Sequence, residues 1–249
     1  PLLFRSVQTH LFPSGFSRSS WEPFVPLETS EVVPSGVACG RTTPAADLRM
    51  LRRRLGAMDG EKIALYAGGL APDRGIETLL EAFARAALRS AGMRLWLAGG
   101  SSSEAYENSL RSRSSKLGIS QRVSFLGSCD DAALLYQAAD AVVLPSMADE
   151  TSGMEAAEAM ACGTPVLASR VGGLSEVLTG PFSKQLFRPG DADDLARRLA
   201  GVVGWREQDP QLGQRCRAHV VEHFSFEASL DGVERAFARA ASEQELIPV

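Results

Sequence analysis

Short apolar runs alternate with helical segments from Lys62 onward. Six runs are apolar enough and short enough to be strands, and they lie at 62–67, 93–98, 122–126, 141–145, 165–169 and 184–187. Such runs are typical of strands that are buried on both faces of a parallel sheet. The pattern therefore predicts one parallel sheet of about six strands within residues 60–205, with helices on both faces.

Helical periodicity fills the intervals between these runs. Within 76–88 the apolar residues fall on one stripe of an amphipathic helix, at Ile76, Leu79, Leu80, Phe83 and Ala87. Further helices are expected at 47–55, 104–117, 130–139, 153–162, 174–178, 191–203 and 211–243, the last broken near Phe224 and Ser225. This alternation implies right-handed βαβ units and a Rossmann-like, doubly wound α/β fold.

The first part of the chain lacks this alternation. Residues 1 to about 45 are rich in Pro and Ser and are expected to be irregular, apart from a short strand and turn in "SEVVPSGV" at 30–37. The chain starts without Met and without the long apolar stretch of a secretory signal. We therefore expect a piece of a longer chain. Its parts are an irregular interdomain remnant at 1–59, a Rossmann-like domain at 60–210 and C-terminal helices at 211–249.

The composition is that of a globular protein and narrows the range of partners. Of the 249 residues, 45% are apolar and 22% are charged, and the formal net charge is −4. This balance gives no reason to expect nucleic acid as a partner, and no apolar run approaches the ~18 residues of a membrane span. The four cysteines form no C-x-x-C pair, so a reducing, cytoplasmic location is expected.

Three glycine-bearing turns follow strand candidates, where doubly wound sheets bind their ligands. The first, "AGGLAPDRG", can present the N–H groups of Gly68 and Gly69 to a phosphate, with Arg74 as a charged partner. Its spacing matches neither the dinucleotide nor the Walker A pattern, so an ordinary turn is an equal alternative. In the second, "AGGSSSEAY", capping of the next helix by serine is the simpler interpretation.

The third turn lies in "PSMADETSGMEAAEAMACGTPVLAS". A helix is expected to begin at Gly153, so the amides around it are first-turn donors that suit an anion or a hydroxyl group. Glu150 precedes this helix and Glu158 lies within it. From spacing alone, Glu158 is either a ligand carboxylate or a solvated helix residue.

Two groups of residues resemble metal motifs only weakly. His219 and His223 are four residues apart on an expected helix, without a cysteine or an acid at the spacing of a zinc motif. Asp191 and Asp193 form a D-x-D pair just before another helix, where Asp is a favoured N-cap. We therefore expect neither a metal nor another cofactor.

Four stretches together resemble a known family. They are "YAGGLAPDRGIETLLEAF", "RVSFLG", "ADAVVLPSMADETSGMEAAEAMACGTPVLASRVGG" and "FRPGDADDLARRLAGVV". In this order they are similar to the C-terminal domain of the retaining glycosyltransferases of family four (glycosyl transferases group 1), which have the two-Rossmann-domain GT-B fold. The likeness covers about Ser30 to Ala240. Its most specific part is the E-x7-E signature from Glu150 to Glu158.

This resemblance implies a domain that binds a sugar donor, either a UDP-sugar or a GDP-sugar. Glu158 would hold the ribose hydroxyls, while Glu150 and the amides of a three-residue stretch would meet the sugar and the diphosphate. The stretch consists of Ser152, Gly153 and Met154. Arg74 would contact the diphosphate, which makes Glu150 and Arg74 the implied catalytic pair. The other implied donor-binding positions are Gly68 and Gly69, and Arg122 and Val123 in the stretch to Gly127 near the base.

The sequence also departs from the family pattern. Gly69 replaces the arginine of the usual G-R-L, Ser152 the phenylalanine of E-x-F-G, and Ser35 the asparagine of V-P-N-G-V. The N-terminal Rossmann domain that would bind the acceptor is missing and would be supplied in cis or in trans.

The resemblance thus implies sugar transfer with retention to an unknown acceptor hydroxyl in glycan biosynthesis. It also implies peripheral membrane association of the full enzyme, and no activity of the isolated chain. The alternatives are a degenerate, non-catalytic nucleotide-sugar-binding module and one subunit of a split enzyme.

Two further expectations concern side-chain placement. Glu155 is expected to point away from the pocket of the two signature glutamates. Phe224, Phe226 and Phe237 are expected to be unusually exposed or to drive self-association, because the family's C-terminal helix crosses back to the missing domain.

Overall fold

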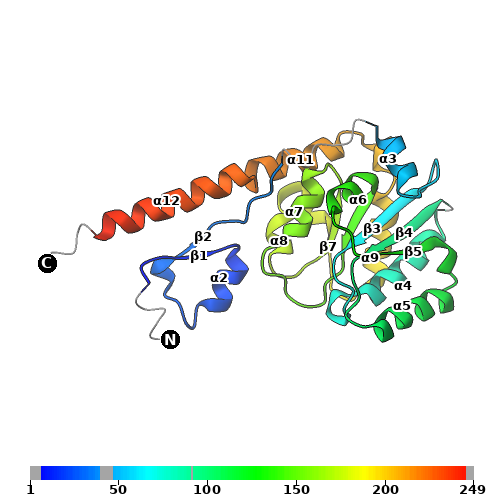
Figure 1. Cartoon of the computed structure of the whole chain (residues 1–249), viewed down its shortest axis with the longest axis horizontal. Helices are drawn as coiled ribbons and strands as arrows, with labels where there is room; N and C mark the ends of the chain where they lie inside the picture. The colour runs from blue at the N-terminus through cyan, green and yellow to red at the C-terminus, as the bar shows by residue number, and fades with distance from the viewer. Residues whose placement is uncertain (1–6, 40–46, 91, 245–249) are drawn as a thin grey trace.

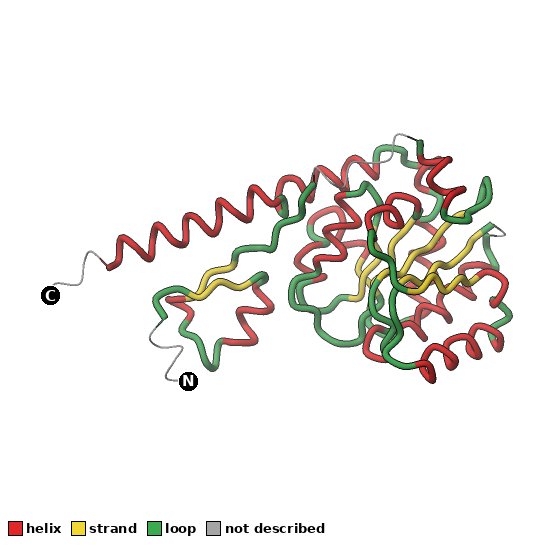
Figure 2. Tube along the Cα trace, viewed as in Figure 1, coloured by secondary structure: helices red, strands yellow, loops and turns green. Residues whose placement is uncertain are grey.

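The computed structural model describes residues 7–39, 47–90 and 92–244, and Figure 1 shows their arrangement. One part is an α/β body built around a parallel sheet. The other part is a small N-terminal unit, which lies beside the long C-terminal helix α12 (Phe226–Gln244). Figure 2 shows the same division, with the strands of the body gathered between helices.

The body contains a six-stranded sheet in which every neighbouring pair is parallel. From edge to edge its strands are β5 (Val123–Gly127), β4 (Met93–Ala98), β3 (Lys62–Ala67), β6 (Ala141–Leu144), β7 (Val166–Ser169) and β8 (Leu186–Phe187). The strand order reverses between β3 and β6, which is the switch point of a doubly wound fold. The predicted parallel sheet is confirmed.

Helices cover both faces of this sheet. They are α3 (Leu48–Arg54), α4 (Ile76–Ala87), α5 (Glu104–Lys116), α6 (Ala132–Ala138), α7 (Met154–Ala161), α8 (Leu174–Val177), α9 (Ala192–Val202), α10 (Trp205–Gln208) and α11 (Leu212–His223). The predicted break in the C-terminal helical stretch is confirmed, because α11 ends at His223 and α12 begins at Phe226. Periodicity did not predict the short α10.

Strand β3 illustrates how the apolar runs form the core. Ile63, Leu65 and Ala67 pack in the cluster that includes α6, α7 and α11, whereas Ala64 and Tyr66 pack in the cluster that includes α4 and α9. Each of the five residues is at most 7% exposed. Because both faces are covered, no polar position interrupts the run, and full burial of a large apolar side chain contributes about 1.5–3 kcal/mol.

The N-terminal unit is more regular than expected. It contains β1 (His10–Phe12), α2 (Gly15–Trp21) and β2 (Ser30–Val32), and the two strands pair in parallel. The expectation of irregular chain is therefore wrong here, although β2 lies in the stretch predicted to contain a strand. These elements are too short for hydrophobic periodicity to reveal them.

The N-terminal unit is joined to the body at a close crossing of two segments. Val37 donates its N–H to the Phe224 carbonyl over 2.8 Å, and its own carbonyl accepts the Phe226 N–H over 3.0 Å. A Cβ on Gly36 would lie 2.6 Å from Phe226 Cα, so this approach requires glycine.

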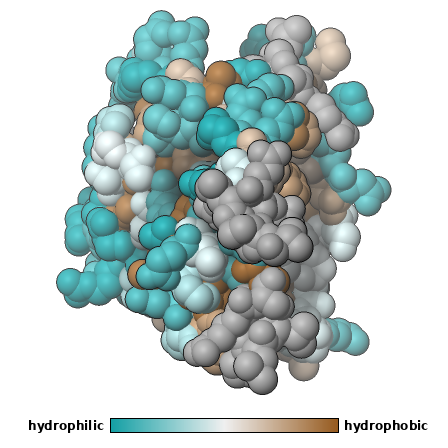
Figure 3. All heavy atoms as spheres, turned by 90° about the vertical axis from the view of Figure 1, so that its left-hand side faces the viewer, coloured by the Kyte–Doolittle hydropathy of each residue, from teal (hydrophilic) through white to brown (hydrophobic). Residues whose placement is uncertain are grey.

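The exposure of the C-terminal aromatic residues agrees only in part with the prediction. Phe226 and Phe237 are 55% and 69% exposed, as predicted. Phe224 is half-buried and packs against the body core, so its predicted exposure is wrong. It follows the end of α11, where its ring centroid lies 6.0 Å from that of His219. Figure 3 views the molecule from the side of the N-terminal unit and the C-terminal end of α12, where apolar residues are scattered among hydrophilic ones.

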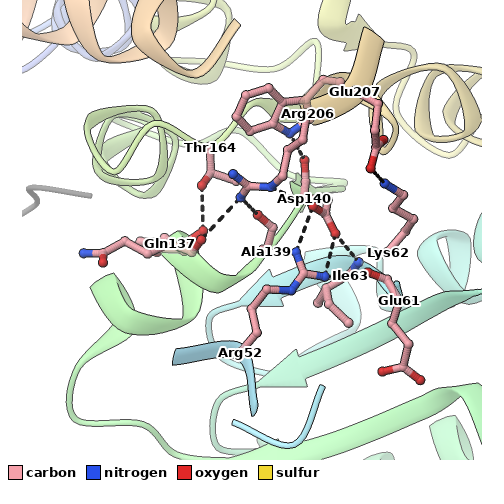
Figure 4. A network of polar contacts seen from close by, with 12 residues as sticks. Arg52, Glu61, Lys62, Ile63, Gln137, Ala139, Asp140, Thr164, Arg206 and Glu207 are labelled. Carbon is pink, nitrogen blue, oxygen red and sulfur yellow. Dashed lines mark hydrogen bonds and ion pairs between the residues drawn. The ribbon is translucent and has the colours of Figure 1, made fainter. Parts of the chain in front are cut away.

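A buried carboxylate links several elements at the amino ends of the strands. Ligands of doubly wound sheets bind at the opposite, carboxyl ends. Asp140, which is 1% exposed, accepts the Ile63 N–H over 2.7 Å. Its two oxygens also accept hydrogen bonds from Arg52, both at 3.0 Å, and from Arg206 Nε at 2.9 Å. Its carbonyl accepts the Trp205 indole N–H over 2.8 Å. Figure 4 shows both guanidinium groups converging on this carboxylate.

Replacing Asp140 tests how much this network contributes to the free energy of unfolding. We expect Asp140→Ala to lower the free energy of unfolding by about 3–5 kcal/mol, because two largely buried arginines lose their counter-ion. Urea denaturation measures the change. Asp59→Ala is the matched control, because Asp59 also pairs with two arginines but on an exposed surface. Equal urea midpoints for the two variants would contradict the prediction.

Candidate functional site

The candidate site lies where the strands β3 to β7 end, and glycines allow its loops to meet. A Cβ on Gly75, whose φ is +68°, would lie 2.0 Å from the Pro145 carbonyl oxygen. A Cβ on Gly99 would lie 1.8 Å from the Gly68 carbonyl oxygen. These contacts bring the loops after β3, β4 and β6 together at the switch point, where ligands of doubly wound sheets bind.

An ion pair joins two of these loops. Arg74, at the end of a 3-10 turn (Pro72–Arg74), donates from Nη1 to Glu150 Oε1. The Ser146 hydroxyl donates to the same oxygen over 2.8 Å. The side chains of Arg74 and Glu150 are 36% and 19% exposed. The structure thus brings the two predicted catalytic residues together, and it adds Ser146, which sequence analysis missed although it lies in the quoted stretch.

The loop from Glu150 to Gly153 is held by the turn after β7. Gly153 has φ +66° and immediately precedes α7, as predicted. Gly173 donates its N–H to the Glu150 carbonyl over 2.7 Å. A Cβ on Gly172 would lie 2.2 Å from the same carbonyl oxygen. The two glycines of "VGGLSEV" therefore support this loop, a role that the sequence pattern did not indicate.

Two adjoining cavities open beside α7, and we call them together the cleft. The first has a volume of about 310 Å³ and is lined by Gly36, Val37, Ala38, Asp130, Asp131, Ala132, Ala133, Tyr136, Met154 and Glu158. The second, of about 330 Å³, is lined mainly by Gly68, Gly99, Gly100, Ser128, Cys129, Leu135, Tyr136 and Glu155. Their sum lies within the range of small-molecule sites, roughly 300–1,000 Å³.

The glutamates of α7 face the cleft. Glu158 and Met154 line the first cavity, one helical turn apart. Glu155 lines the second cavity, so the expectation that it points away is wrong. The physical reason is helical geometry, because residues at i and i+3 share a face. Burial, and then the Glu155 carboxylate, raise the pKa of Glu158 above its ordinary value.

The predicted base-contacting residues lie elsewhere. Arg122 and Val123 lie at the amino end of the β5 segment, and Arg122 donates to the Ala87 carbonyl over 3.0 Å. The assignment of these two residues to the donor site is therefore corrected, since ligands bind at the opposite end of the strands. The carboxyl end of β5 is at Gly127, and Ser128, which follows it, lines the second cavity.

The two glycines of the first turn differ in their surroundings. Gly68 lines the second cavity, as expected for a donor-binding position. The Gly69 carbonyl accepts the Tyr66 hydroxyl hydrogen over 2.7 Å. A Cβ built on Gly69 would meet no atom within 4 Å, so this position has room for a side chain.

The weak metal motifs have structural roles. His219 Nε2 lies 2.8 Å from the Val177 carbonyl, and its ring is 4.9 Å from that of His223 and 5.0 Å from that of Phe182. The Asp191 carboxylate caps α9 by accepting the Asp194 N–H over 2.9 Å. Within the part of the chain that the structure describes, no three His, Cys, Asp or Glu residues are grouped so as to hold a metal ion. Among the described helices, none has the length and apolar character needed to cross a membrane.

A six-stranded parallel sheet with a glycine-lined cleft at its switch point defines a Rossmann-like α/β protein. Residues 49–219 match the family described as "Glycosyl transferases group 1", so the chain belongs to this family.

Curated relatives are similar along most of the chain. A D-inositol 3-phosphate glycosyltransferase of Nocardia farcinica is 34% identical over 219 residues, which cover 86% of this chain and 48% of the relative. A lipopolysaccharide 1,2-N-acetylglucosaminetransferase of Salmonella typhimurium is 29% identical, covering 87% of this chain and 58% of the relative. The chain spans about half the length of the curated relatives it matches.

Solved structures agree with the fold. Anabaena HepE in complex with UDP superposes with a TM-score of 0.88 at 23% identity, covering 96% of this chain and 65% of that protein. The sucrose-phosphate synthase of Thermosynechococcus elongatus gives a TM-score of 0.80 at 28% identity, covering 97% and 60%. The sheet and its flanking helices thus have the Rossmann-like form of the GT-B fold.

The raised pKa of Glu158 predicts a pH-dependent effect on stability. The folded protein holds the Glu158 proton more tightly than the unfolded chain, so folding penalises the charged form. We expect Glu158→Gln to raise the free energy of unfolding at about pH 7 and to lose this gain as the pH falls toward about 4. Urea titrations at both pH values measure it, with Glu234→Gln on an exposed position of α12 as the control. A destabilisation that persists at the lower pH would contradict the prediction.

Proposed function

We propose that this chain is the donor-binding part of a retaining glycosyltransferase that transfers a sugar from UDP or GDP to an acceptor hydroxyl. The observation that carries the proposal is the Arg74–Glu150 pair close to the start of α7, with Glu158 in the cavity beside the same helix. A nucleotide-sugar runs from the base through the ribose and the diphosphate to the sugar, so in this proposal Glu158 meets the ribose, Arg74 the diphosphate and Glu150 the sugar.

The leaving diphosphate is the group that the proposed site stabilises. The N-terminus of α7 carries partial positive charge from its aligned peptide dipoles, and Arg74 adds a full positive charge. Glu150 holds Arg74 through an ion pair. As negative charge develops on the diphosphate, the Arg74 guanidinium donates to it, which lowers the barrier to departure.

Ribose binding is assigned to Glu158. Its carboxylate is half-buried and lines a cavity that Gly36, Val37 and Ala38 also line. A carboxylate accepts hydrogen bonds from two adjacent hydroxyls, and burial strengthens such bonds. The base is assigned to the second cavity, near Ser128 and Cys129.

The acceptor is assigned to a second Rossmann domain supplied in cis or in trans, since the curated relatives are about twice as long as this chain. The isolated chain then lacks transfer activity, because aligning two reactants can supply about 7–11 kcal/mol of barrier lowering. We place the full enzyme in glycan biosynthesis in the cytoplasm, with peripheral membrane association and without a metal or other cofactor. The cysteine spacing suits a reducing compartment, because no two of the four cysteines form a C-x-x-C pair.

A second candidate is a non-catalytic nucleotide-sugar-binding module. The observation that favours it is Gly69, which leaves open space where the family pattern has a second cation. One donor fewer on the leaving group costs about 2–4 kcal/mol of transition-state stabilisation. A split enzyme is compatible with both candidates.

Carboxylate-to-amide substitutions test the proposed site. We expect Glu158→Gln to weaken binding of UDP or GDP about ten- to hundredfold, because charge-assisted hydrogen bonds contribute about 1.5–3 kcal/mol. Glu150→Gln is expected to weaken the nucleotide-sugar more than the bare nucleoside diphosphate. Calorimetry with UDP, GDP and their glucose conjugates measures both, and the exposed Glu234→Gln is the control. Failure of the wild-type chain to bind any of these ligands would overturn the proposal.

Filling the space at Gly69 tests the role of the missing cation. We expect Gly69→Arg to strengthen UDP binding about tenfold, because a guanidinium can add a charge-assisted bond to the diphosphate. Gly201→Arg on α9 is the matched control, since it also places an arginine in open space. Calorimetry with UDP and with uridine separates the two effects. An equal gain for uridine would show that the added side chain does not act through the diphosphate.

A further inference from the structure

The N-terminal unit contacts α8 through a carboxylate outside the family signature. Glu176, a half-buried residue of α8, accepts the N–H of Gly15 at one oxygen over 2.8 Å and the N–H of Phe16 at the other over 2.6 Å. Both oxygens are thus bonded to the first turn of α2. Hydrogen bonds to a charged acceptor are stronger than neutral ones.

A buried serine makes a second connection beside the first. Ser14 is 2% exposed, and its hydroxyl accepts the Ser17 N–H over 2.9 Å as the N-cap of α2. The same hydroxyl donates to the Thr151 carbonyl in the loop from Glu150 to Gly153. The Ser14 hydroxyl therefore caps the start of α2 and also holds the loop. It can do both only in one relative placement of the two segments.

Helix α8 links these two connections, because it is bonded both to α2 and to the loop. Gly173 donates to the Glu150 carbonyl over 2.7 Å, and the Glu176 N–H donates to the Gly173 carbonyl over 3.0 Å. A Cβ on Gly173 would lie 2.8 Å from the Thr151 carbonyl oxygen, so the loop and α8 are in direct contact. The start of α2, the start of α8 and the loop from Glu150 to Gly153 therefore fix one another.

We propose that Glu176 and Ser14 are positioning residues that hold the loop from Glu150 to Gly153 in the conformation that receives a diphosphate. The inference rests on the proposed function, because the ligand it concerns is the donor diphosphate. It adds that the N-terminal unit takes part in donor binding through Ser14 and the first turn of α2, which do not touch the donor. Placement of that unit and order of the loop then depend on each other.

The first test uses no ligand. In Glu176→Gln the amide nitrogen faces a backbone N–H and cannot accept it, so one of the two bonds is lost. We expect the exchange of the Gly173 amide hydrogen, which is bonded to the loop, to accelerate about tenfold in hydrogen-exchange measurements on the full chain. Glu22→Gln, on the exposed end of α2, is the control and should leave this rate unchanged. An unchanged Gly173 rate in Glu176→Gln overturns the positioning role.

The second test uses UDP and uridine as probes. We expect Glu176→Gln and Ser14→Ala each to weaken UDP binding about three- to tenfold and to leave uridine binding unchanged, because the loop would contact UDP at its diphosphate, which uridine lacks. Equal losses for both ligands would point to general damage to the fold and overturn the proposal. If the wild-type chain binds none of UDP, uridine, GDP and guanosine, the proposed function fails. Hydrogen exchange then still decides whether Glu176 holds the loop.

Discussion

The buried carboxylate of Asp140 is the constraint on which the body depends. It accepts hydrogen bonds from a strand amide and from two arginines, and it reaches β3, α3 and the start of α10 at once. Burial lowers the pKa of Arg206, and the Asp140 charge opposes this shift. A buried ion costs several kcal/mol to desolvate, so the carboxylate is tolerated only while all these donors are in place. The elements it joins therefore have one arrangement, which leaves the opposite edge of the sheet free for loops.

Backbone contacts, rather than side chains, bring the loops of the cleft together. Gly75 meets Pro145, and Gly99 meets Gly68, at separations that leave no room for a Cβ. The glutamates and the arginine then project from a framework of neighbouring main chains. Side chains carried by loops of this kind keep a fixed spacing without a bound ligand, which reduces the ordering cost of binding.

The sequence predicted the sheet well because its strands are buried on both faces, so each run is apolar without interruption. It placed Gly153 and the two signature glutamates near one another because they lie on one strand–loop–helix unit. It failed for Glu155, where helical geometry alone was sufficient to place the side chain beside Glu158. It failed for Arg122 because the assignment ignored the direction of β5.

Contacts between distant segments could not be predicted in this way. Ser14 and Glu176 are 162 positions apart, and neither stands out by period or by composition. Short elements such as β1 and α2 carry too few apolar residues for a pattern. Their placement depends on tertiary hydrogen bonds, which a single sequence does not reveal.

Two carboxylates of the body that pair with arginine show how burial separates structure from function. Asp140 is 1% exposed and has several donors, so no ligand can replace its arginines without leaving buried charge behind. The Arg74–Glu150 pair is 36% and 19% exposed, and water can solvate either partner when the pair opens. A partly exposed pair contributes little to stability, so the exchange of Glu150 for a diphosphate on Arg74 that we propose would cost little. The same chemistry therefore holds the fold at one edge of the sheet and remains available to a ligand at the other.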